Sequence, residues 1–185
     1  MRSIGRLIAI QQPLPKSADI IVVAIDADGA GTLEAANLVH RGVSSRVAVF
    51  TDPPTAVDRE FLRRGLPYHD QGAISIHQLQ MLGVDNVVLI PRGASGSQQE
   101  GEILPQWCDE QHYHSVVLVT SGDHSRRLSR IMRRSLRGHQ TTVTIDSSPY
   151  ADFNLDSWWE TRAGVREGIF ELQKLIFDVI RHPMS

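Results

Sequence analysis

The sequence predicts an α/β domain, a Rossmann-like three-layer sandwich in which helices cover a mostly parallel sheet of about five strands. Short apolar, β-branched runs, such as Ile20 to Ile25, are typical of strands buried on both faces. These runs alternate with stretches of helical periodicity, which is the order that parallel strands with crossover helices require. A chain of 185 residues, 41% of them hydrophobic, is long enough to enclose one core.

The elements are expected in the following order. Pro13 and Pro15 favour an extended chain, so residues 1–19 are expected to form an extended N-terminal segment and residues 20–182 a single domain. Strands are expected at 20–25, 46–50, 86–90, 115–120 and 141–145, and helices at 32–41, 57–64, 74–82, 100–111, 124–137 and 164–180. A glycine follows most of these helices, as is typical of helix C-termini. On the last helix, one apolar face is expected to pack on the core: Val165, Ile169, Leu172, Ile176 and Val179.

The composition excludes several classes of protein. A formal charge of −2 argues against a general nucleic-acid binder, whose affinity comes from neutralising phosphates. The single cysteine, Cys108, rules out an internal disulfide and a cysteine-based metal cluster, and we expect it to be a small core residue. No apolar run approaches the ~18–20 residues that span a bilayer. The run at 7–10 is too short for a signal peptide, so the chain as given is expected to be soluble.

The segment after the fourth strand carries the strongest functional signal, because ligands of open α/β sheets bind beyond the carboxyl ends of the strands. Arg126 and Arg127 are unfavourable in the first turn of a helix, where the dipole is positive, unless an anion lies there. We therefore expect both to bind an anion. Thr120 and Ser121 are further candidate contacts, and His124 is a candidate general acid or base near neutral pH. The arginines farther along this helix are expected to face solvent: Arg130, Arg133, Arg134 and Arg137.

The Gly/Ser-rich turn after the third strand is the second candidate site. Small hydroxyl-bearing turns before a helix can hold phosphate with backbone N–H groups, and Ser95 and Ser97 lie in this one. Arg92 is expected to be the first residue of the turn and Glu100 follows it, and both are included as ligand-binding candidates. The turn lacks the terminal Gly-Lys-Ser/Thr of a P-loop, and a plain turn with a capping role explains it equally well. We expect this turn and the helix start at His124 to lie at neighbouring strand ends.

Two aspartates, Asp26 and Asp28, follow the first strand. The pattern resembles the first motif of haloacid-dehalogenase-type phosphatases, in which one aspartate attacks phosphorus and the other handles the proton, with magnesium between them. No acidic pair follows the later strands to complete a metal site, so a turn stabilised by the aspartates is the default interpretation and no metal ligand is assigned. In the C-terminal region, Trp158 is expected to pack, with one ring of the tryptophan pair closing the cleft. Glu171 and Lys174 are expected to form an i, i+3 surface pair.

Four segments together resemble one known family. The stretch Pro-Leu-Pro-Lys-Ser-Ala-Asp-Ile-Ile-Val-Val resembles the pattern PLPxADxIVVL, and Leu-Gly-Val before the third strand resembles an LGV connection. His124 and Arg127 are spaced as in TSxxHxxRA, and the tryptophan pair followed by Glu171 and Lys174 resembles a W…E…K ending. These are features of the YdcF-like family, to which the SanA and ElyC proteins belong, and the resemblance spans roughly residues 13–180.

The resemblance departs at two loops, which indicates a divergent subgroup. The family's Gly-rich turn after the first strand is replaced by Asp26 and Asp28, and its SxNTxEN loop is represented by Ser95, Ser97 and Glu100. The resemblance implies a Rossmann-like domain linked to bacterial cell-envelope biogenesis. It also implies anchoring by a membrane helix outside this chain, with the domain on the outer side of the inner membrane. A cytoplasmic location is also compatible with the chain.

These observations predict a domain that binds an anionic, phosphate-bearing small molecule at the carboxyl edge of the sheet. The ligand would be of nucleotide or lipid-phosphate type, with no nucleic-acid partner and no other assigned cofactor. The sequence leaves open whether a reaction is catalysed. One alternative is a metal-dependent phosphatase built on Asp26 and Asp28. The other is a non-catalytic partner-binding module that uses the arginine face and the tryptophans.

Overall fold

The protein is built on a five-stranded, all-parallel sheet, as expected. The computed structural model describes residues 2–68 and 70–184, with side chains from residue 5 onward. The strands are β1 (Ile20–Val23), β2 (Val47–Thr51), β3 (Val87–Gly93), β4 (Ser115–Thr120) and β5 (Thr142–Ser147). Their order in the sheet is β3-β2-β1-β4-β5, and every neighbouring pair is parallel. The central β1 is fully buried, which explains its unbroken Ile/Val run.

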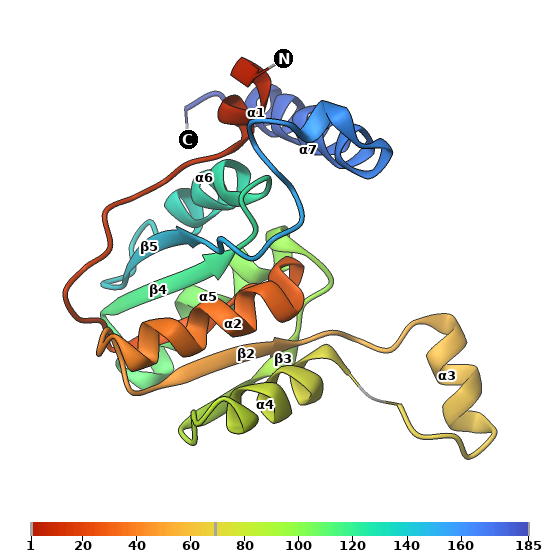
Figure 1. Ribbon diagram of the computed structural model, residues 1–185. Coiled ribbons are helices and arrows are strands. Elements are labelled where there is room, and N and C mark those ends of the chain that lie inside the picture. The colour runs from red at the N-terminus through yellow and green to blue at the C-terminus, as the bar shows by residue number, and fades with distance from the viewer. Residues whose placement is uncertain (1, 69, 185) are drawn as a thin grey trace.

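Helices cover both faces of the sheet (Figure 1). On one face α2 (Asp28–His40) packs with α4 (Gln71–Met81), and on the other α5 (Ser97–Gln111) packs with α6 (Ser125–Ser135). The sheet order reverses between β1 and β4, so the carboxyl ends of these two strands form the switch point at which ligands bind in such folds. The Rossmann-like three-layer sandwich predicted from the sequence is therefore confirmed.

Three further helices lie outside these layers: α1 (Arg2–Ile8), α3 (Ala56–Arg63) and α7 (Arg162–Arg181). Figure 1 shows α3 projecting away from the sheet, and α7 lying beside α1 and α6. Two short 3₁₀ turns, η1 (Ile25–Ala27) and η2 (Trp158–Glu160), complete the described elements. Among the described helices, none is long and apolar enough to cross a bilayer.

The N-terminal segment corrects one prediction. Residues 1–19 were expected to be extended, but residues 2–8 form α1, whose Ile8 is buried against Trp158. The chain is extended only after α1, where the Ser125 hydroxyl accepts from the N–H of Ile10 and the Gln12 side chain accepts from the N–H of Ile145. The second contact gives the edge strand β5 a partner, which is one way in which proteins protect an exposed sheet edge.

Several element boundaries also differ from prediction. The helix expected from residue 32 begins at Asp28, because Gly31 lets the first turn pack closely on β1: a Cβ there would lie 2.9 Å from Val23. β3 continues beyond residue 90 through Pro91, which an edge strand tolerates. Arg92 therefore belongs to a strand rather than to the Gly/Ser-rich turn, and α5 begins three residues early at Ser97.

The orientation of α7 is the largest departure. Its core-facing side was expected to carry Val165, Ile169, Leu172, Ile176 and Val179. Instead, the buried stripe is Gly164, Gly168, Glu171, Leu175 and Asp178, and most of the expected face is exposed. At about 100° per residue, the buried stripe is rotated by about a third of a turn from the predicted one. Ion pairs and glycine contacts, rather than apolar periodicity, therefore determine which side of α7 is buried.

The contact between α7 and Trp158 gives a first prediction. A Cβ at Gly168 would lie 2.7 Å from the indole ring, so Gly168→Ala is expected to lower the free energy of unfolding by about 1–3 kcal/mol through overpacking. The control is Gly29→Ala in α2, where no atom lies within 4 Å of the added Cβ. Chemical denaturation measures both variants, and equal stability of the two would contradict the packing seen at Trp158.

Candidate functional site

A cleft of about 680 Å³ opens at the switch point between the carboxyl ends of β1 and β4. Six carboxylates line it: Asp26, Asp28, Asp123, Asp152, Glu167 and Glu171. Its cationic or titratable nitrogen groups are His124, Arg166 and Lys174, and its aromatic rings are Tyr150, Phe153 and Phe170. Four of the predicted site residues line this cleft: Asp26, Asp28, Ser121 and His124. The cleft therefore lies where the sequence placed it, but carboxylates outnumber cations along its walls.

Glu171 of α7 is the centre of the site, and reasoning from the residues missed it. His124 Nδ1 lies 2.9 Å from Glu171 Oε2, and Arg127 Nε donates to the same oxygen at 3.0 Å. Lys174 Nζ donates to Oε1 at 2.6 Å, so the expected i, i+3 pair exists. Only Lys174 of this pair lies at the surface, because Glu171 is buried.

Glu171 also explains the arginine at the start of α6. An anion was expected there, because positive side chains are unfavourable beside the positive end of a helix dipole. The structure supplies that anion from the chain itself, since Glu171 pairs with Arg127 in the first turn of α6. Arg127 therefore stabilises the site by binding Glu171 and is not the predicted anion-binding residue for a ligand.

The protonation of His124 follows from these neighbours. Burial by itself lowers its pKa, but the hydrogen bond to Glu171 and the charges of Asp123 and Asp26 outweigh that effect and raise it. For Glu171, burial raises the pKa, but bonds to His124, Arg127 and Lys174 prevail and lower it to about 2. Both shifts favour an imidazolium paired with a carboxylate. With Nδ1–H donating to Glu171, Nε2 lies 3.6 Å from Asp123 Oδ2.

Residues in the first turn of α5 contact this site, and the sequence did not predict how they do so. The turn after β3 and the helix after β4 do not follow neighbouring strands, because β2 and β1 lie between them. The contact instead comes from α5: Ser97 Oγ donates to Asp26 Oδ2 at 3.1 Å, and Glu100 Oε1 accepts from the N–H of Ile25 at 2.7 Å. Burial raises the pKa of Glu100 to about 7. Both side chains therefore support the cleft wall from behind.

Two hydroxyls at the end of β4 are buried, and no hydrogen-bond partner for them lies among the described residues. These are Thr120 Oγ1 and Ser121 Oγ, and Glu100 Oε2 is a third such atom. Buried polar atoms are normally paired, so each of these requires a partner such as a ligand or a water. Ser121 lines the cleft, but its hydroxyl oxygen is buried behind the cleft surface.

Other predicted site residues lie outside the cleft. Arg126 does not clamp an anion, because its guanidinium donates to the carbonyl of Ala9 at 2.9 Å and holds the N-terminal segment. Arg92 bonds Gln106 and Glu110 of α5, and Ser95 bonds Gln99. Trp158 packs on Ile8, Phe153 and Leu175, with Trp159 at its edge, so it is a core residue.

The arginine face of α6 is corrected in part. Arg133 and Arg137 are exposed, as expected for a solvated face. Arg130 and Arg134 are not, because Arg130 Nε and Arg134 Nη2 each donate to Asp178 of α7 at 2.7 Å. The helix therefore uses two of the four arginines to bind α7.

The described residues also bear on three alternatives: a reactive cysteine, a preformed metal site and the pair Asp26 and Asp28. Cys108 is fully buried, and burial raises the pKa of its thiol to about 12, so it is a core residue as predicted. Over 2–68 and 70–184, no three His, Cys, Asp or Glu side chains converge in a way that could hold a metal ion. Asp26 and Asp28 do line the cleft together, and burial, with the charges of Asp26 and Asp52, raises the pKa of Asp28.

Comparisons with known proteins give one distant likeness. No protein-family model matches the chain, and no curated protein is similar to it. Among solved structures, the universal stress protein from Archaeoglobus fulgidus, determined in complex with dAMP, has the same kind of α/β fold. The two chains are 16% identical with a TM-score of 0.37, over 71% of this chain and 98% of the other. At that level the likeness carries no inference about the ligand of this chain.

Proposed function

We propose that this chain is a divergent YdcF-like domain that binds a phosphate-bearing small molecule in the cleft, with His124 as its acid–base group. One observation supports the proposal above all. Two of the four segments that carry the family resemblance, around His124 and around Glu171, are distant in sequence and are bonded to one another beside the cleft. A purely structural helix contact would not need a histidine at the cleft wall.

The geometry supports a definite role for His124. Its Nδ1–H is held by Glu171, so Nε2–H is the group that can donate to a ligand phosphate or to a leaving oxygen. The raised pKa favours the protonated ring, which is the form that a proton donor or an anion contact requires.

The acidic lining restricts how a phosphate can enter. A bare phosphate would be repelled by the carboxylates, so we expect it to arrive with a divalent cation. Mg²⁺ is typically bound by one or two carboxylates plus the phosphates of a substrate, which does not require a preformed cage of ligands. Asp26 and Asp28 are the side chains proposed to contact that cation.

Calorimetric titration with a nucleoside diphosphate and with a short-chain polyprenyl phosphate tests the binding, each with and without Mg²⁺. One of the two ligands is expected to bind, more tightly with Mg²⁺, and His124→Gln is expected to weaken it at least tenfold. The control is Arg133→Gln, which changes an exposed residue of the same helix. Absence of binding by both probes, or equal affinity in His124→Gln, would overturn the proposal.

The pKa of Asp28 favours a second candidate, a metal-dependent phosphatase. In that reaction Asp26 would attack phosphorus, the ester P–O bond would break, and protonated Asp28 would donate its proton to the leaving oxygen. Water would then hydrolyse the aspartyl phosphate. Mg²⁺-dependent phosphate release that is lost in Asp26→Asn but retained in His124→Gln would select this mechanism over the first.

The envelope-linked role that the resemblance implies is part of the same proposal. A chromosomal His124→Gln substitution is expected to reproduce the sensitivity to cell-wall antibiotics of a deletion strain. A normal envelope in both strains would remove this part of the proposal without affecting the binding test.

A further inference from the structure

The outer side of α7 carries an exposed apolar patch, which we call the α7 patch. It consists of Ile169, Ile176, Phe177, Val179 and Ile180, together with Leu7 of α1. Phe177 is 63% exposed and Ile180 is 74% exposed. Single exposed apolar residues are normal, but a contiguous patch of large ones marks an interaction site.

A groove lies directly beside the most exposed part of the patch. Its volume is about 440 Å³, and its apolar lining includes Leu7, Ile10, Leu172 and Leu175. Ile176, Val179 and Ile180 belong both to the groove and to the patch. Protruding apolar side chains therefore lie beside a hollow whose lining is mostly apolar, with Arg126, Arg130 and Arg133 also lining it.

We propose that the α7 patch is the interface of a two-fold symmetric dimer of this chain. In such a dimer the same surface of both copies makes contact, so Phe177 and Ile180 of each copy can enter the groove of the other. The area is adequate. Side chains of this size present on the order of 200 Å² each, so six that are about half exposed offer on the order of 600 Å² per partner, or on the order of 1,200 Å² in total, which is the lower end of the range for specific interfaces.

The chemistry of the patch favours a second copy over a lipid surface. Arg181 lies over the ring of Phe177, 5.9 Å from its centroid, and arginine and aromatic residues are enriched at protein interfaces. Helices that lie in a membrane surface direct a polar, charged face to water, whereas the face of α7 opposite the patch is buried.

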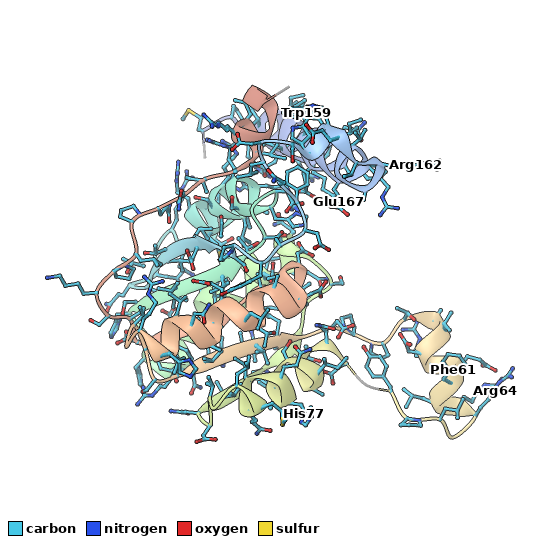
Figure 2. The ribbon with its side chains drawn as sticks, viewed as in Figure 1. Phe61, Arg64, His77, Trp159, Arg162 and Glu167 are labelled. Atoms are coloured by element: carbon cyan, nitrogen blue, oxygen red, sulfur yellow. The ribbon has the colours of Figure 1, made fainter. Side chains whose placement is uncertain are left out.

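Sedimentation velocity of the full chain at about 5–50 µM tests the proposal, since interfaces of this size typically give micromolar or tighter dissociation constants. A dimer is expected, and the double substitution Phe177→Ser with Ile180→Ser is expected to raise the dissociation constant at least tenfold. The matched control is Val57→Ser with Phe61→Ser, which removes two exposed apolar side chains from α3. Figure 2 shows Phe61 at the projecting helix, far from Arg162 of α7.

A cross-link provides a second measurement that needs no loss of folding. Cys108 is fully buried, so the cysteine of Ile180→Cys is the accessible thiol. Mild oxidation is expected to give a disulfide-linked dimer, whereas Val57→Cys is expected to stay monomeric. A monomer at all concentrations, a dimer unaffected by the α7 substitutions, or a dimer lost in the α3 control would each overturn the proposal. So would a monomer that co-sediments with phosphatidylglycerol vesicles and loses that binding in the α7 variant.

Discussion

Glu171→Ala is expected to lower the free energy of unfolding by about 3–5 kcal/mol. The substitution leaves Arg127 and His124, both largely buried, without the carboxylate that compensates their charges, and removing one member of a buried ion pair has effects of that size. Chemical denaturation measures the change. The matched control is Glu167→Ala, one turn earlier on α7, where the partner Arg166 is exposed. That control is expected to change stability by less than about 0.5 kcal/mol.

The pH dependence gives the same prediction an independent test. Because the pKa of Glu171 falls from 4.5 to about 2 on folding, its stabilisation is present above pH 4.5 and is lost as the pH falls toward 2. The pKa of His124 rises above 6.5, so its stabilisation is present below pH 6.5 and is lost as the pH rises through the raised value. The stability difference between the unchanged protein and Glu171→Gln is therefore expected to be largest between pH 4.5 and 6.5. A difference independent of pH would contradict the ion pair.

The fold could be predicted because its determinants are local. The run at Ile20 to Val23 is buried on both faces, and such a run has few alternatives to a central parallel strand. The location of the cleft followed from topology, since the ends of β1 and β4 meet wherever the sheet order reverses. Asp26, Ser121 and His124 were found in this way, without any knowledge of their contacts.

The partners of α6 could not be predicted, because they depend on how α7 is rotated. Hydrophobic periodicity assigned the wrong side of α7, since burying Glu171 and Asp178 is unfavourable until cations opposite them are known. A signal was nevertheless present. The buried acids are spaced by seven residues, and His124, Arg127, Arg130 and Arg134 recur at spacings of three or four. Two such stripes of opposite charge predict one interface when they are considered together.

Asp178→Ala is expected to destabilise the protein to a similar extent, by about 3–5 kcal/mol. Asp178 is buried between α6 and α7, and both of its oxygens accept from arginines: Oδ2 from Arg130 and Oδ1 from Arg134, each at 2.7 Å. Removing the carboxylate leaves two largely buried guanidinium groups facing a cavity. The control is Asp156→Ala, which breaks an exposed pair with Arg6 and is expected to change stability by at most about 1 kcal/mol.

The consequence for function follows from the position of Asp178 on α7. The same helix carries Glu171, so a helix that loosens at Asp178 also releases the group that orients His124. Asp178→Ala is therefore expected to weaken ligand binding although Asp178 does not line the cleft. Asp178→Asn, which retains the shape and one acceptor, is expected to recover part of both losses. If Asp178→Ala were as stable as Asp156→Ala, the ion pairs between α6 and α7 would not be what holds α7 against the domain.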